Sequence, residues 1–241
     1  MTTLIPGHRL EHVESWFGGD LTEYCVDKQD RIQGTQIRWY KSGQKSETNY
    51  VDGKVEGLYR FFNKDGAVIT EWTLKKGQKH GRAMWCRSDG TRCECDYNMG
   101  KVVRVVSLTD RQGRDAMLPD GEVEVWKACK TCKGDDGVGL YVRLRVPADA
   151  RRVTPMCSPE GKWEPQSRVE YAIVVSIDDG MGTTQPYTEA TSFVRKGTSL
   201  VYRVGEVVRP DGYDPDPGHE CGKGINVHRY RDQCEAWFRG L

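Results

Sequence analysis

The stretch that decides the fold runs from Gly34 to Lys101 and divides into three similar segments. They read GTQIRWYKSGQKSETNYVDGK (34–54), VEGLYRFFNKDGAVITEWTLKKGQ (55–78) and KHGRAMWCRSDGTRCECDYNMGK (79–101). Glycines recur at 23 or 24 residues in three separate registers: Gly34, Gly57 and Gly81; Gly43, Gly66 and Gly90; Gly53, Gly77 and Gly100. A period in the twenties, shared by three registers, predicts a repeat architecture.

One unit of the repeat contains two runs that are typical of strands, joined by a turn. Residues 58–62 (LYRFF) lead into the turn 63–66 (NKDG), and residues 67–74 (AVITEWTL) follow it with the alternation of a strand that has one wetter face. Asp-Gly and Asn-rich turns tolerate positive φ and therefore favour hairpins. Because a lone hairpin is marginally stable in water, we expect neighbouring units to form one continuous antiparallel sheet.

Weaker copies of the repeat extend beyond the quoted stretch. Gly19 precedes Gly43 by 24 residues and Gly113 follows Gly90 by 23, while Asp30 stands where a turn glycine is expected. We therefore predict about four hairpin units, with degraded terminal copies that cap the stack against water.

The composition changes near residue 115. One proline precedes that point and nine follow it, and the glycine period stops there. We therefore expect hairpin repeats over residues 1–115 and a second domain over residues 116–241. The second domain has strand patterns at 139–146, 169–177 and 199–208 and a helical pattern near 229–238. The predicted fold class is mainly β, an antiparallel β-hairpin repeat sheet followed by a compact β-rich α+β domain.

Charge and hydropathy restrict the classes of partner. The 36 basic and 35 acidic residues leave a net charge of +1, which gives no reason to expect nucleic acid or an acidic membrane surface. No run approaches the roughly 18 apolar residues of a membrane span, and residues 1–16 lack the pattern of a secretory signal. We therefore expect a protein that is neither secreted nor membrane-spanning, with its nine cysteines mostly reduced.

The turn segments carry a resemblance to a known repeat family. Residues 39–43 (WYKSG), 52–57 (DGKVEG) and 76–81 (KGQKHG) resemble variant MORN repeats (membrane occupation and recognition nexus), over roughly residues 16–113. This resemblance implies a repeat sheet that serves as a protein-binding scaffold. Its name adds a weaker association with membrane surfaces.

The C-terminal half carries a second resemblance. Residues 144–153 (LRVPADARRV), 202–214 (YRVGEVVRPDGYD) and 220–225 (ECGKGI) resemble an uncharacterised domain of large DNA viruses of amoebae (Marseillevirus-like), which is often joined to repeat segments. This resemblance implies a viral setting, in the host cytoplasm or in the virion. It implies no particular activity.

The aromatic residues of the repeats are either the packing face of the sheet or anchors for a partner. A single-layer sheet cannot bury both of its faces, and aromatic side chains supply much of the energy of protein interfaces. Our first hypothesis is therefore a non-enzymatic binding or scaffold protein of a large DNA virus, such as a minor capsid-associated virion component, with capsid proteins or a second copy of itself as partner. The candidate binding residues are Trp39, Tyr40, Phe61, Phe62, Trp72 and Trp85.

Two further hypotheses concern chemistry in the C-terminal half. Cys129 and Cys132 form a CxxC pair, but a zinc site takes about four ligands and no second CxxC exists, so the alternatives are a zinc site completed by other residues and two free thiols. No other cofactor is expected.

The alternative function is an enzyme of unknown reaction, with a site built from Cys221, His219, His228 and Asp214. A nucleophilic Cys–His pair requires hydrogen-bond contact between the two side chains, which the spacing permits but does not demand. A third alternative is a membrane-surface binder that acts through the repeats.

Overall fold

The computed structural model describes residues 5–14, 19–132, 138–161, 164–182, 187–193 and 199–239. The chain divides into two compact units, residues 1–88 with 92–106 and residues 89–91 with 107–241. The regular secondary structure of both units is mainly antiparallel β-strand, as the sequence predicts. The division at residue 106 precedes the composition change near residue 115.

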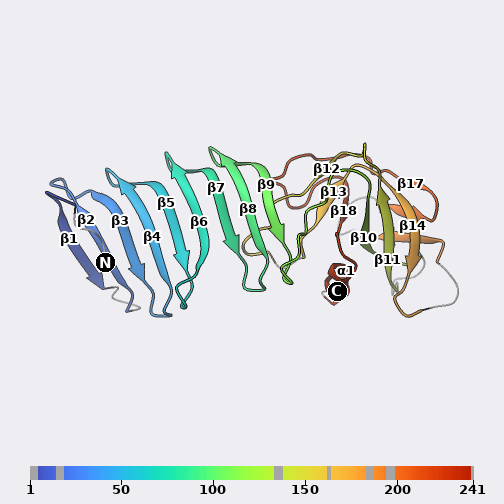
Figure 1. Ribbon diagram of the computed structural model, residues 1–241, viewed down its shortest axis with the longest axis horizontal. Coiled ribbons are helices and arrows are strands. Elements are labelled where there is room, and N and C mark those ends of the chain that lie inside the picture. The colour runs from blue at the N-terminus through green and yellow to red at the C-terminus, as the bar shows by residue number, and fades with distance from the viewer. Residues whose placement is uncertain are drawn as a thin grey trace. The chain divides into compact units, whose positions relative to one another are not determined.

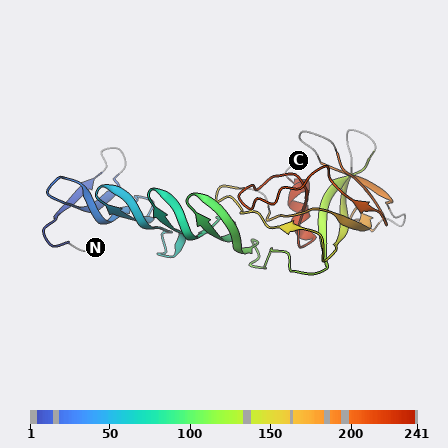
Figure 2. The same cartoon turned by 90° about the horizontal axis from the view of Figure 1, so that it is seen from above.

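The first unit is built on a nine-stranded antiparallel sheet whose neighbours follow one another in chain order (Figure 1). Figure 2 shows the same strands from above, as a single, strongly twisted layer. Only residues 107–109 of the last strand belong to the second unit. The strands are β1 (Arg9–Glu14), β2 (Leu21–Val26), β3 (Ile32–Trp39), β4 (Lys45–Val51), β5 (Lys54–Phe62), β6 (Val68–Lys75), β7 (Gln78–Cys86), β8 (Arg92–Asn98) and β9 (Lys101–Thr109).

Each glycine register has its own role in this sheet, and the three registers quoted above all have φ between 74° and 94°. Gly66 ends a turn in which its amide donates to the carbonyl of Asn63. Gly53 follows Asp52, also at positive φ, in the two-residue turn that suits the twist of a hairpin. Gly57 lies in β5 where the pairing with β4 shifts register. L-residues avoid this region of φ, so the glycine period of the sequence reflects the turn and bulge period of the sheet.

The second unit contains a six-stranded and a three-stranded antiparallel sheet, in the strand orders β16-β15-β10-β11-β14-β17 and β12-β13-β18. Its core takes alternate residues of β11, since Leu140, Val142, Leu144 and Val146 are fully buried. The elements are β10 (Val123–Lys130), β11 (Gly139–Val146), β12 (Arg152–Val153), β13 (Ser167–Val169), β14 (Ala172–Asp178), β15 (Glu189–Ser192), β16 (Val201–Arg203), β17 (Val207–Val208), β18 (Ile225–Val227) and α1 (Asp232–Arg239).

Two predicted strands of the second unit are divided in the structure. The pattern over 169–177 begins at the end of β13 and continues in β14, which belongs to a different sheet. The pattern over 199–208 is interrupted after Arg203, where Glu206 donates its amide to the Arg203 carbonyl and Gly205 has a φ of 87°. The turn separates β16 from β17, which lie at opposite ends of the strand order. A local apolar pattern indicates strand propensity but not the point at which the chain turns.

Within the second unit, a buried carboxylate joins the turn that follows β9 to the C-terminal helix. Asp110 accepts hydrogen bonds from the Arg114 guanidinium at 2.7 and 2.9 Å and from the Gln233 side-chain amide at 3.0 Å. The helix α1 also packs against β10. Within the described residues, no helix has the length and apolar content to cross a membrane.

Candidate functional site

The pairing register sorts the central side chains of the nine-stranded sheet into two faces. Residues directly opposite one another on neighbouring strands share a face, and consecutive residues on one strand do not. Tyr59 pairs with Trp72 across β5 and β6, and the next pair, Arg60 with Glu71, faces the other way. The sheet therefore has an aromatic face and a charged face at the same two strands.

The aromatic face carries close ring contacts. The rings of Tyr59 and Trp72 are stacked with their centres 4.6 Å apart, and Lys79 Nζ lies 4.1 Å from the centre of the Trp72 ring. Tyr40 and Phe61 meet edge to face at 5.6 Å. All five side chains are half-buried. The face thus presents aromatic surface that is ordered by its own contacts and still accessible.

The charged face is held by ion pairs. Arg60 Nε lies 2.7 Å from the Glu71 carboxylate, and Lys45 Nζ lies 2.8 Å from that of Glu47. Partly exposed pairs of this kind add little to stability. Aromatic side chains lie on the charged face as well, but the stacked and edge-to-face ring pairs lie on the aromatic face, which we take as the candidate interaction surface.

The six aromatic residues singled out from the sequence do not form one surface. Phe61 and Trp85 both pair with Thr70 and share the aromatic face, but Trp85 is 1% exposed. Trp39 and Phe62 both pair with Lys45, on the charged face. Sequence reasoning missed Tyr59, although its position two residues before Phe61 on the same strand was a signal for it.

The CxxC pair is divided between core and surface. Cys129 is fully buried in β10, and burial raises the pKa of its thiol to about 12, whereas Cys132 is exposed beyond the strand end. A zinc ligand must be a thiolate, so a raised thiol pKa opposes metal binding. Among the residues that the structure describes, no three His, Cys, Asp or Glu side chains are placed to hold a metal ion.

Of the four residues proposed for an enzymatic site, the structure brings Asp214 and His219 into contact. The Asp214 carboxylate lies 2.9 Å from His219 Nδ1 and 3.2 Å from Arg168, whose guanidinium is fully buried. Arg168 also donates to the main-chain carbonyls of Asp214, at 2.7 Å, and of His219. The hydrogen bond to Asp214 raises the pKa of His219. This arrangement fixes the loop around Arg168, and its chemistry is that of a structural ion pair.

The other two residues of the alternative site do not complete a nucleophilic pair. Cys221 is exposed, and in the described structure neither His219 nor His228 forms a hydrogen bond with its thiol. His228 is 3% exposed, with Nδ1 2.9 Å from the Pro165 carbonyl oxygen, and burial lowers its pKa to about 4.

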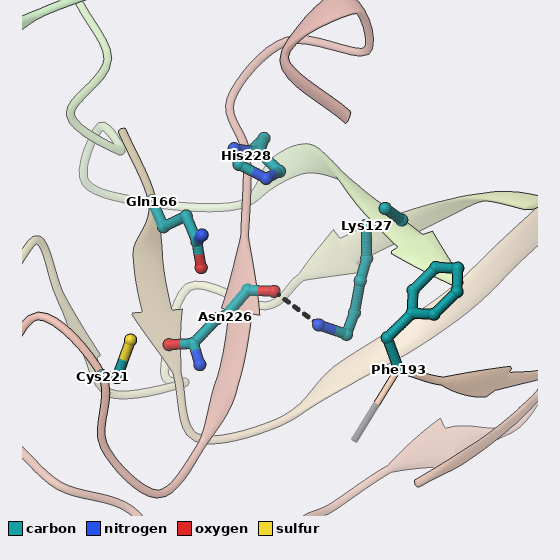
Figure 3. A pocket seen from close by; sticks show the side chains of 7 residues that line it. Lys127, Gln166, Phe193, Cys221, Asn226 and His228 are labelled. Carbon is teal, nitrogen blue, oxygen red and sulfur yellow. Dashed lines mark hydrogen bonds between the residues drawn. The ribbon is translucent and has the colours of Figure 1, made fainter. Parts of the chain in front are cut away.

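Cys221 and His228 do line a common cavity of about 100 Å³ (Figure 3). Its wall includes a residue that sequence reasoning missed, Lys127, whose Nζ donates to the main-chain carbonyl of Asn226 at 2.9 Å. Burial lowers the pKa of this amine. In the sequence VEVWKACK, Lys127 falls in the same alternate positions as Val125 and Cys129, so a lysine at a core position of the strand was the signal for it. The side chains labelled in Figure 3 are Lys127, Gln166, Phe193, Cys221, Asn226 and His228.

Comparison with known proteins gives one family. Residues 113–236 match a family whose description reads "Family of unknown function (DUF5758)". The matched segment covers just over half of the chain and lies within the second unit. A search of curated proteins finds no match.

Proposed function

The chain belongs to the DUF5758 family of unknown function, and from that premise we propose that it is a non-enzymatic binding or scaffold protein. In this proposal, the first unit docks another protein on the aromatic face of its sheet, and the second unit is the family domain that it carries. The resemblance to MORN repeats supports the scaffold role. The resemblance to virus-encoded domains supports a partner in the virion, such as a capsid protein.

One observation carries the proposal, the half-buried aromatic side chains at the centre of the aromatic face. The stacked pair Tyr59–Trp72 and the neighbouring Phe61 present large apolar surfaces whose rotamers are already restricted by ring contacts. Preordered aromatic side chains lose little entropy on binding and are enriched at the energetic centres of interfaces. Lys79, above the Trp72 ring, adds a charge that favours an acidic group on the partner.

The sheet provides a matched pair of variants for the test. Tyr59→Thr/Trp72→Thr removes the central aromatic pair, and Arg60→Thr/Glu71→Thr removes the neighbouring pair on the opposite face of the same two strands. Threonine keeps a high strand propensity in both. Circular dichroism and thermal unfolding first establish that both variants fold.

The assay is affinity capture from cells and virus particles that contain the chain, followed by binding measurements with the purified partner. We expect a protein that the wild type and the charged-face variant bind alike, and that the aromatic-face variant binds at least about tenfold more weakly. If the partner is a second copy, sedimentation will show an oligomer that only the aromatic-face variant dissociates. Equal loss in both variants, or no partner that depends on the aromatic face, would overturn the proposal.

A further inference from the structure

We infer that the cavity between β10 and β18 is a binding site for a small carboxylate that also carries a neutral hydrogen-bond donor, as a 2-hydroxy acid does. The inference concerns the second unit and is independent of protein docking on the sheet. It rests on the polar groups that Figure 3 shows around the strand of Asn226.

The first group is a lysine amine that has no carboxylate partner among the described residues. The Lys127 amine donates to the main-chain oxygen of Asn226. The charged forms of the two nearby thiols are disfavoured, because burial raises the pKa of both Cys129 and Cys234. Burial disfavours the protonated form of this amine, and an anion bound in the cavity would stabilise that form.

The second group is an unused acceptor. The side-chain oxygen Oδ1 of Asn226 is buried and has no hydrogen-bond partner among the described residues. Leaving a buried acceptor unpaired costs free energy, and a ligand hydroxyl or amide N–H would remove that cost. Asn226 and Lys127 both line this cavity, and the inference places one small molecule against both residues, with the Asn226 side chain turned to meet it.

The charges of the cavity define the ligand class. Burial lowers the pKa of both His228 and Lys127, and Lys127 is the basic side chain of the described lining that an anion would most readily hold protonated, because its ordinary pKa is the higher of the two. A single cation suits a monoanion better than a phosphate dianion, which proteins usually bind with several donors. An ammonium on the ligand would repel that of Lys127, so the donor for Asn226 is neutral. A carboxylate with an adjacent hydroxyl meets these conditions.

The test is a titration of the isotope-labelled full chain, followed by amide NMR, with glycolate, acetate and inorganic phosphate as probes. We expect glycolate to shift the signals of Lys127, Asn226 and His228 saturably. Acetate lacks the hydroxyl and should bind about threefold to tenfold more weakly, as expected for one lost hydrogen bond. Tighter binding of phosphate, or no saturable shift with any probe in the tens of millimolar, would overturn the inference.

Three variants assign the roles. Lys127→Met should lose at least about tenfold in glycolate affinity, whereas Lys130→Met, on the same strand, should bind as the wild type does. Asn226→Ala keeps the main-chain acceptor of Lys127 and should bring glycolate down to the affinity of acetate. If Lys127→Met does not fold, the ratio of glycolate affinity to acetate affinity in Asn226→Ala decides the inference. A ratio equal to that of the wild type, or full glycolate binding by Lys127→Met, contradicts the assignment.

Discussion

The buried carboxylate of Asp110 offers the sharpest test of how the second unit is held together. It is 0% exposed and accepts hydrogen bonds from the amides of Gln112 and Arg114 in addition to the side chains of Arg114 and Gln233. Burial by itself would raise its pKa, but these hydrogen bonds and the Arg114 charge hold the pKa below its ordinary value. Asp110→Asn removes the charge and turns an N–H group toward other donors.

The size of the effect follows from the exposure of the partners. Breaking a buried ion pair costs about 3–5 kcal/mol. The Arg114 side chain is 32% exposed and can regain water, and a second carboxylate, Asp232, lies 2.8 Å from it. Both features favour the lower end of the range, so we expect a loss of about 3 kcal/mol. This is about a hundredfold in the unfolding equilibrium.

Urea unfolding of the full chain measures this loss, and Asp232→Asn is the matched control. Asp232 is 37% exposed and pairs with the same arginine, so its loss should cost below about 1 kcal/mol. A carboxylate with a depressed folded pKa contributes fully above its unfolded pKa of about 3.9, and that contribution is lost as pH falls through the folded value. The difference in unfolding free energy between wild type and Asp110→Asn should therefore become smaller as pH falls from about 7 to about 3. Equal losses in the two variants, or a gap that widens in acid, would refute the reasoning.

Three further outcomes are expected. Gly77→Ala should lower the free energy of unfolding by about 1–2 kcal/mol, the cost of placing an L-residue in the left-handed region. No further cost is expected, because a Cβ there meets nothing within 4 Å. Gly222→Ala should cost more in the same denaturant assay, because its Cβ would overlap the buried Arg168 guanidinium; equal costs would contradict the packing. In NMR titrations the midpoint of His228 should lie near pH 4 and that of His219 above 6.5. Since the folded pKa of His228 is lowered, the free energy of unfolding should fall as pH drops from about 6.5 toward 4. The variant His228→Asn should lack this fall, and an unfolding free energy with the same pH dependence in both proteins would count against the assignment.

The repeat sheet could be predicted from the sequence because its signals are local. A turn or bulge at positive φ selects glycine wherever it occurs, so the period of the sheet is visible as a glycine period. Even the exception follows this logic, since Asp30, which stands in place of a turn glycine, has a φ of 58°. The alternation of side chains likewise separates Phe61 from Phe62 without any tertiary information. The burial of Trp85 is different, because it depends on what packs against the strand.

The groups of the second unit that could carry function come from distant parts of the chain. Lys127 and Asn226 are 99 residues apart, and Asp110 and Gln233 are 123 apart. Their meeting depends on the order in which antiparallel strands pair, which leaves no local trace in the sequence. The sequence by itself determined the hairpin period, the alternation of the strands and the absence of a catalytic spacing motif. Only the tertiary structure decided which polar groups lie unpaired in a cavity, because burial and lost hydration are properties of the packed chain.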